Sequence, residues 1–366
     1  MTTKSLRRVL IMAGGTGGHV FPGLALAHYL RTKNIDIHWL GTKQGLEAQL
    51  VPEAHLPLHC ISISGLRGKG IMTLLKAPIM LVIAFIQSCR ILYRIQPDVV
   101  IGLGGFASGP GGLASYFMRY PFIIHEQNAK AGFTNKTLAH FSNKILEGFP
   151  AAFQSRANVI VIGNPIRCEI ETLPPPQERF YKRSLPLRLL VSGGSLGAQA
   201  INEIVPKMLR RLAPEERPEV WHQTGKKHFY LTKEAYFSSK LQVNLVPFIE
   251  DMAKAYAWAD MVLCRAGALT VAELCAVGLG AIFVPYPYAV DDHQTANANY
   301  MVKHHAALCI QQSELTDVRL AAILKELAYA PDRRLAMAKA AYQLRFIDVS
   351  EKIFAILCAE VKLAKI

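Results

Sequence analysis

The chain has 366 residues, 51% of them hydrophobic, a length that exceeds one compact core and predicts two domains. Its basic N-terminus, residues 1–8, leads into glycines without the apolar core or cleavage site of a signal peptide, and no stretch reaches the roughly 20 apolar residues of a membrane span. The formal net charge of +14 predicts an acidic partner. We expect anionic lipid or a phosphorylated substrate, not nucleic acid, because no zinc finger, RNA-recognition signature or dense Lys/Arg run is present.

Short β-branched runs alternate with helical patterns along the chain. The expected strands are residues 9–12, 35–40, 99–101, 122–124, 144–146 and 159–162, then 187–191, 220–223, 243–246, 261–264 and 281–284. Strands this apolar, separated by helices, predict parallel sheets covered on both faces. The pattern breaks after Ile162, at Gly163-Asn164-Pro165. We therefore expect an α/β protein with two Rossmann-like, doubly wound domains facing across a cleft, residues 1–163 and 164–350, with a last helix, 351–366, that packs back on the first domain.

Glycine-rich turns follow the first strand of each predicted domain. Gly14-Gly15-Thr16-Gly17-Gly18 is matched in the second half by residues 193–197, and residues 102–105 form a third such turn. A turn of this kind lets backbone N–H groups approach a phosphate at a helix N-terminus; a tight turn without a ligand is the alternative. The spacing is not a dinucleotide fingerprint, because GxGxxG begun at Gly15 fails at Val20 and no acidic residue ends the second strand.

Two polar groups are candidate general bases. His19 closes the first glycine turn at the start of a predicted helix, where a neutral imidazole could accept a proton from a sugar hydroxyl. His125-Glu126-Gln127-Asn128 follows the strand at 122–124, either as part of the site or as a solvated loop. His19 is the leading candidate, with Glu126 and His125 in reserve. The seven cysteines and the histidines show no metal-ligand spacing, so we expect reduced thiols and neither a protein-bound metal nor a cofactor.

In the second half, polar residues follow two predicted strands. Residues 265–273 open a helix after the strand at 261–264, and Glu273 lies on it. Its carboxylate either offsets the helix dipole or accepts two hydrogen bonds from a ribose diol. Residues 291–298 carry side chains that suit the hydroxyls of a sugar, although the same string is also an ordinary helix start.

The segment from Ile71 to Ile91 predicts contact with a membrane surface. It holds ten apolar residues from Ala77 to Ile86, and residues 61–100 carry five basic side chains (Arg67, Lys69, Lys76, Arg90 and Arg94) against one acidic side chain. Basic residues beside an apolar helix face suit an anionic bilayer. A buried core helix is the alternative. The expected membrane residues are Ile79, Leu81, Val82, Phe85 and Ile86.

Taken together, these strings resemble the MurG family, the UDP-N-acetylglucosamine transferases of peptidoglycan synthesis in glycosyltransferase family 28. The similar strings are residues 14–23, 102–110, 125–128, 163–167, 193–198, 265–273 and 292–298, in the family's order over nearly the whole chain. Gly278-Leu279-Gly280 has glycine where the family commonly has proline, which affects a loop and not the chemistry.

The resemblance implies a GT-B fold and an inverting transfer of GlcNAc from UDP-GlcNAc to lipid I, giving lipid II, without a metal-binding Asp-x-Asp motif. It implies a peripheral protein on the cytoplasmic face of the inner membrane, with an anionic membrane surface and other wall-synthesis and division proteins as partners. A UDP-GlcNAc 2-epimerase of the same fold and a non-catalytic nucleotide-binding scaffold are the alternatives.

The family's functional residues carry over by motif. Thr16, Gly17 and Gly18 are expected near the donor phosphates and sugar, and Gly104 and Gly105 at the acceptor pyrophosphate. Arg167 and the backbone of Ile249 are expected at the uracil and Ser195 at a phosphate. The GlcNAc and ribose are assigned to Asn128, Ala268, Leu269, Thr270, Val271, Ala272, Glu273 and Gln294.

Overall fold

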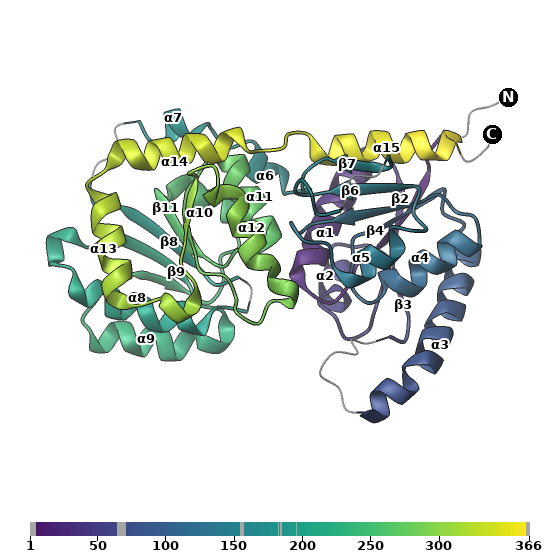
Figure 1. The fold of residues 1–366 in the computed structure, drawn as a ribbon, viewed down its shortest axis with the longest axis horizontal. Coiled ribbons are helices and arrows are strands. Elements are labelled where there is room, and N and C mark those ends of the chain that lie inside the picture. Colours follow the sequence, from purple (N-terminus) through teal and green to yellow (C-terminus); the bar gives the residue numbers. More distant parts are fainter. Residues whose placement is uncertain are drawn as a thin grey trace. The chain divides into compact units, whose positions relative to one another are not determined.

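A computed structural model describes residues 5–63, 71–153, 157–181, 183, 185–194 and 196–363, with side chains described except at 71–76 and 290. The chain forms two compact units (Figure 1). Unit 1 is Met1–Ile166 with Asp348–Ile366, and unit 2 is Arg167–Ile347. Ser195, Arg67 and Lys69 lie outside the described residues.

The described part of unit 1 contains a seven-stranded sheet in the order β3-β2-β1-β4-β5-β6-β7, with every neighbouring pair parallel. The central strands are apolar and buried because helices cover both faces of the sheet. The strands are β1 (Arg8–Met12), β2 (Asp36–Gly41), β3 (Leu58–Cys60), β4 (Val99–Gly102), β5 (Phe122–Glu126), β6 (Lys144–Glu147) and β7 (Val159–Val161). The helices are α1 (Gly17–Thr32), α2 (Glu47–Glu53), α3 (Ile71–Ile95), α4 (Ser108–Phe117), α5 (Phe133–Leu138) and α15 (Val349–Leu363).

Unit 2 repeats this topology in its described residues, with six parallel strands in the order β10-β9-β8-β11-β12-β13. The strands are β8 (Arg188–Ser192), β9 (Glu219–Gln223), β10 (Asn244–Val246), β11 (Met261–Cys264), β12 (Gly280–Phe283) and β13 (Ala307–Cys309). The helices are α6 (Cys168–Glu171), α7 (Pro176–Arg179), α8 (Gln199–Arg211), α9 (Phe229–Ser238), α10 (Met252–Trp258), α11 (Ala268–Val277), α12 (His293–Val302), α13 (Asp317–Ala328) and α14 (Pro331–Gln343).

The prediction of two doubly wound parallel sheets is confirmed. In each unit the first strand lies in the middle, and the chain order reverses beside it, between β1 and β4 and between β8 and β11. Such a reversal leaves a crevice beyond the carboxyl ends of the strands, where ligands of open α/β sheets bind. All three glycine turns follow strands at these two points. Two edge strands, β3 and β13, were not predicted from the sequence.

The last helix belongs to unit 1 although it is far from it in sequence. Helix α15 packs on α1, with Tyr29 and Phe354 in edge-to-face contact at 6.3 Å between ring centroids. Its inward residues recur every four positions, the spacing of one face of an α-helix, and are buried: Val349, Ile353, Leu357 and Val361. The helix therefore completes the cover over this face of unit 1.

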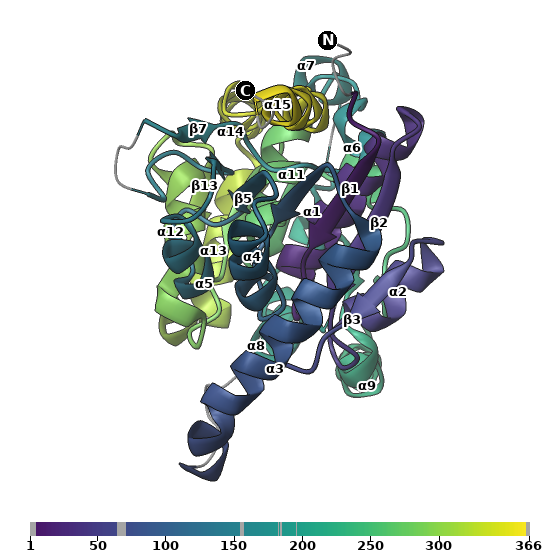
Figure 2. The ribbon, with the colours of Figure 1, turned by 90° about the vertical axis from the view of Figure 1, so that its right-hand side faces the viewer.

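Helix α3 packs on α4 through one face and exposes an apolar opposite face. Ala84, Ser88, Leu92 and Ile95 are buried. The end of the helix near Ile71 projects beyond the rest of unit 1 (Figure 2). Residues 77–95, with a mean hydropathy of 1.5, are long and apolar enough to cross a membrane by length and composition alone. The expectation that no stretch reaches this threshold is therefore wrong. It counted only the continuous apolar run from Ala77 to Ile86, whereas Cys89, Ile91 and Leu92 keep the mean hydropathy high beyond Gln87 and Ser88.

The expected membrane residues on α3 divide into two groups. Ile79, Leu81, Val82 and Ile86 are exposed, with 65% of Ile79 and 58% of Val82 open to solvent. Phe85 is half-buried, packs against the core and contacts Phe117 edge to face at 5.9 Å. It differs because it lies next to Ala84 at the border of the buried stripe. Arg90 and Arg94 are exposed at the C-terminal end of the helix.

Candidate functional site

In unit 1 the two glycine turns touch each other. The turn after β1 and the turn after β4 leave neighbouring strands of the sheet. A Cβ atom at Gly105 would lie 2.1 Å from the Gly14 carbonyl oxygen, and the residue has a φ of +84°. Only glycine fits both the backbone angle and the approach. The contact brings Thr16, Gly17 and Gly18 to the same edge of the sheet as Gly104 and Gly105.

A buried carboxylate supports the first turn. Glu47, the first residue of α2, is fully buried and accepts hydrogen bonds from Gly15 N (2.9 Å), Thr42 N (2.9 Å) and Thr42 Oγ1 (2.7 Å). Sequence reasoning missed Glu47, because nothing in its local pattern distinguishes it from an exposed glutamate at a helix start. Its distance in sequence from the turn hides its role, which is to fix the path of the backbone at Gly15.

His19 lies on the first turn of α1, against the glycine turn that follows β4. Its Nδ1 is 3.5 Å from Thr16 Oγ1. A Cβ atom at Gly104 would lie 2.8 Å from His19 Cδ2 and 3.0 Å from Nε2, so the imidazole occupies the space that a side chain at 104 would take. The ring is half-buried beside two segments of backbone that the fold holds in place. This setting suits a histidine that exchanges a proton with a bound ligand.

The other two candidate bases, His125 and Glu126, are buried and fully engaged. His125 Nε2 is 2.8 Å from the Gly163 carbonyl oxygen and Nδ1 is 3.1 Å from Gln127 Nε2, and burial lowers the pKa of this histidine. Glu126 accepts hydrogen bonds from Asn128 N and Nδ2, Gly132 N and Asn135 Nδ2. Together these bonds shape the loop that carries Asn128, which is half-buried.

In unit 2 the turn after β8 rests on the end of β9. Gly194 and Gly197 have φ angles of +82° and +79°, and a Cβ at Gly197 would meet the Thr224 carbonyl oxygen at 1.9 Å. Gln223, the last residue of β9, donates to the Gly194 carbonyl oxygen (2.9 Å) and accepts from Ile249 N (2.9 Å). Gln223, which was not predicted from the sequence, therefore links the expected phosphate turn to the expected uracil segment. The N–H of Ile249 is already engaged in a hydrogen bond to Gln223.

Arg167 and Glu273, 106 residues apart, form an ion pair, with Arg167 Nη2 at 3.1 Å from Glu273 Oε1. The hydroxyl of Tyr256 donates to Glu273 Oε2 at 2.9 Å. Glu273 is not an exposed helix-dipole partner, since its side chain is only 12% exposed. Burial holds the pKa of Glu273 above its ordinary value, although the Arg167 charge and the two hydrogen bonds oppose the rise in part. A buried carboxylate with a charged partner and lone pairs still available is suited to bind a diol.

The remaining expected donor residues lie at the start of α11 and α12. Leu269, Thr270 and Ala272 are half-buried at the solvent side of α11, whereas Ala268 and Val271 are buried and present backbone. Gln294 Oε1 accepts from Tyr286 N at 2.9 Å. The loop before α11 is held by Arg265, which donates to the carbonyl oxygens of Val284 (2.9 Å) and Pro285 (3.0 Å).

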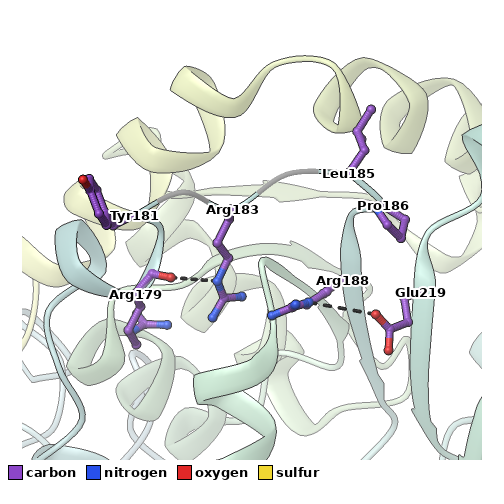
Figure 3. A pocket seen from close by; sticks show the side chains of 7 residues that line it. All are labelled: Arg179, Tyr181, Arg183, Leu185, Pro186, Arg188 and Glu219. Atoms are coloured by element: carbon purple, nitrogen blue, oxygen red, sulfur yellow. Dashed lines mark hydrogen bonds and ion pairs between the residues drawn. The ribbon is translucent and has the colours of Figure 1, made fainter.

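A pocket of about 320 Å³ lies at the opposite edge of the unit 2 sheet (Figure 3). Arg183 and Arg188 point toward one another across it, and its lining residues are Arg179, Tyr181, Arg183, Leu185, Pro186, Arg188 and Glu219. Arg188 and Glu219 are the first residues of β8 and β9. Ligands of such sheets bind beyond the carboxyl ends, so this pocket is not the expected nucleotide site. Among the residues that the structure describes, no group of three or more His, Cys, Asp or Glu side chains could hold a metal.

Two parallel Rossmann-like sheets, with two glycine turns at the point of reversal in unit 1 and one in unit 2, are the architecture of the GT-B class of nucleotide-sugar proteins. Residues 9–147 match the glycosyltransferase family 28 N-terminal domain and residues 188–353 match its C-terminal domain. A Marinobacter nauticus protein named UDP-N-acetylglucosamine--N-acetylmuramyl-(pentapeptide) pyrophosphoryl-undecaprenol N-acetylglucosamine transferase is 50% identical over 96% of this chain and 97% of its own length.

The crystal structure of Acinetobacter baumannii MurG is similar with a TM-score of 0.83 and 37% identity, covering 96% of this chain and 99% of that one. The chain therefore belongs to glycosyltransferase family 28 and, within it, to the MurG transferases. A UDP-N-acetylglucosamine 2-epimerase structure, at a TM-score of 0.64 and 15% identity over 96% of this chain and 95% of that one, shares the fold alone.

Proposed function

We propose that this protein transfers GlcNAc from UDP-GlcNAc to the C4 hydroxyl of the MurNAc of lipid I, with inversion, and so makes lipid II for peptidoglycan synthesis. The observation that carries the proposal is the 50% identity over 96% of the chain to a transferase with this name. The contacts of the site support it, because every segment expected to bind the donor is fixed by a specific hydrogen bond or close backbone approach.

Unit 2 is assigned the nucleotide of the donor. The carboxylate of Glu273 accepts hydrogen bonds from the ribose hydroxyls, and Arg167 beside it contributes positive charge. Ile249 meets the uracil through its backbone. Since the Ile249 N–H already donates to Gln223, its carbonyl oxygen is the group that accepts from uracil N3–H. The Gly194 turn takes a phosphate, and Gln294 at the start of α12 meets the GlcNAc hydroxyls.

Unit 1 is assigned the acceptor and the general base. The acceptor hydroxyl loses a proton as it attacks the anomeric carbon, and UDP leaves with an extra negative charge. His19 takes that proton, since its half-buried imidazole lies against both glycine turns, whereas His125 and Glu126 are buried within the loop network. Backbone N–H groups at Thr16, Gly17 and Gly18 and at helix N-termini stabilise the developing charge. The Gly104 and Gly105 turn holds the acceptor pyrophosphate.

Replacement of His19 by Ala tests the base assignment. We expect kcat to fall at least about 100-fold, the lower range for removal of a general base, with the free energy of unfolding nearly unchanged because the ring is only half-buried. The measurement is transfer of labelled GlcNAc at saturating substrates. Activity within a few-fold of the parent protein would remove His19 from this role and would make Glu126 the candidate in spite of its engaged carboxylate.

The exposed apolar face of α3 is proposed to contact the cytoplasmic surface of the inner membrane, where the lipid acceptor resides. Ile79, Leu81, Val82 and Ile86 would enter the interface, with Arg90 and Arg94 near anionic headgroups. The buried stripe through Ala84 and Leu92 supports a surface contact over a membrane span, because a span would strip α3 from α4 and expose the core of unit 1.

One assay separates the proposed reaction from its alternatives. The purified protein is given labelled UDP-GlcNAc with and without a lipid I analogue. The proposal requires a lipid-linked disaccharide that forms only when the acceptor is present. Formation of a UDP-linked epimer without acceptor would indicate an epimerase. Binding of UDP-GlcNAc without any turnover would indicate a non-catalytic scaffold.

A further inference from the structure

Arg167, Tyr256 and Glu273 come from three helices that meet in unit 2. Arg167 precedes α6, Tyr256 lies in α10 and Glu273 in α11, and α6 contacts both of the other helices. The two donors to the carboxylate differ in accessibility. The Arg167 side chain is 44% exposed, whereas Tyr256 is 2% exposed. The exposed Arg167 side chain can therefore follow a ligand, while the buried Tyr256 hydroxyl is held inside the fold against Glu273.

The hydroxyl of Tyr256 stays a donor at every working pH. Burial raises the pKa of Tyr256 well above its ordinary value, and the nearby Glu273 charge raises it further. The proton therefore stays on the phenol and is directed at Glu273 Oε2. The same hydrogen bond favours the ionised carboxylate and lowers the pKa of Glu273 against the effect of burial. Loss of the hydroxyl removes that opposing contribution.

The helices that carry Tyr256 and Glu273 are fixed to one another by Arg179, a lining residue of the pocket in Figure 3. Arg179 Nη2 donates to the Gly278 carbonyl oxygen at the end of α11 (2.8 Å), and Nη1 donates to the Tyr256 carbonyl oxygen (3.4 Å). Arg183 donates to the Trp258 carbonyl oxygen at the end of α10 (2.6 Å). These bonds set the spacing between α10 and α11, and with it the direction of the Tyr256 hydroxyl.

We propose that Tyr256 is a positioning residue of the donor pocket, whose hydroxyl orients the Glu273 carboxylate so that its remaining lone pairs face the ribose 2′ and 3′ hydroxyls. A carboxylate has about four lone-pair positions, and Tyr256 and Arg167 occupy one on each oxygen. One position on each oxygen remains, which matches a vicinal diol. The inference rests on the proposed function, because ribose binding by Glu273 is part of it.

The test is Tyr256→Phe, which removes the hydroxyl and keeps the buried ring. Binding of UDP and of 2′,3′-dideoxy-UDP is measured by calorimetry. We expect UDP affinity to fall about 5- to 20-fold, part of the effect of a hydrogen bond to a charged group, while affinity for the dideoxy analogue stays unchanged. The matched control is Tyr236→Phe, which removes another buried tyrosine hydroxyl of unit 2, one that contacts His222. It should leave both affinities unchanged.

A pH series and a double mutant distinguish positioning from packing. UDP binding should weaken as pH falls and protonates Glu273, and Tyr256→Phe should move that decline to higher pH because the pKa of Glu273 rises. Tyr256→Phe in a Glu273→Gln background should change UDP affinity no further. Additive effects, an unshifted pH profile, or equal losses for both ligands would overturn the role of Tyr256.

The same binding measurements distinguish failure of ribose binding by Glu273 from failure of the role of Tyr256. If the parent protein binds UDP and the dideoxy analogue equally well, Glu273 does not bind the ribose and the proposed function fails at this point. If the parent protein discriminates and Tyr256→Phe discriminates equally, only the inference about Tyr256 fails. Should the Phe variant not fold, 3-fluorotyrosine at 256 keeps the shape with a more acidic phenol. The decline of UDP binding must then move to lower pH, and an unmoved decline refutes the inference.

Discussion

Replacement of Gly104 by Ala tests the contact between the second glycine turn and His19. The new Cβ would lie 2.8 Å from His19 Cδ2, and ordinary contact begins at 3.4 Å, so the ring must retreat by about 0.6 Å. A misplacement of about 1 Å at a catalytic group costs about 100-fold in rate. We therefore expect kcat to fall roughly 10- to 100-fold, while the affinity for UDP in unit 2 stays unchanged.

The cost in stability can be separated from the displacement of His19. Gly104 has a φ of +100°, so an L-residue there is strained by about 1–2 kcal/mol. Gly15 has nearly the same angle, +90°, but a Cβ there meets no atom within 4 Å. Gly15→Ala should thus lower the free energy of unfolding as much as Gly104→Ala does, because the imidazole moves aside at little cost. Urea unfolding of the two variants measures this.

The assay is transfer of labelled GlcNAc to a lipid I analogue at saturating donor and acceptor, which removes any loss of acceptor affinity at the turn. In a His19→Ala background, Gly104→Ala should lower kcat no further, since its effect acts through the ring. If Gly104→Ala keeps kcat within a few-fold of the parent, or if its effect persists without His19, the reasoning about this contact is refuted.

Three further predictions follow from other parts of the fold. The double variant Ile79→Glu with Val82→Glu on α3 should release the protein from anionic vesicles without loss of UDP binding. The control pair Tyr230→Glu with Phe237→Glu, at residues 80% and 84% exposed on α9, should leave vesicle binding unchanged. Equal release by both pairs would contradict a specific role for α3. Glu273→Gln should weaken UDP binding by roughly 1.5–3 kcal/mol, about 10- to 100-fold. The surface control Glu314→Gln should leave UDP affinity unchanged. Calorimetry with 2′,3′-dideoxy-UDP checks that the loss lies at the ribose. Burial lowers the pKa of His222 from 6.5 to about 3, so the unfolded state binds more protons and stability should fall as pH drops below 6.5, by about 1.4 kcal/mol per pH unit. His222→Gln should flatten this slope in urea titrations, and an unchanged slope would contradict it.

The sequence alone determined the fold class and the positions of the chemistry-bearing turns. Buried parallel strands are continuous apolar runs, and glycine turns at their ends are local signals, so both are legible without the fold. The strands β3 and β13 were not predicted because they carry no such local signal. Leu58–Cys60 and Ala307–Cys309 are three-residue edge strands, and pairing with β2 and β12, not their own pattern, makes them strands.

Only the tertiary structure decided which side chains act together. The buried carboxylate of Glu47 under Gly15, the His19 ring against Gly104, and the meeting of Tyr256, Arg167 and Glu273 each join residues from separate elements. The structure also shows that His125 and Glu126 belong to a buried hydrogen-bond network and that Phe85 is half-buried and packs against the core. Burial and partners depend on how helices pack on a sheet, and residues far apart in sequence carry no local sign of that packing.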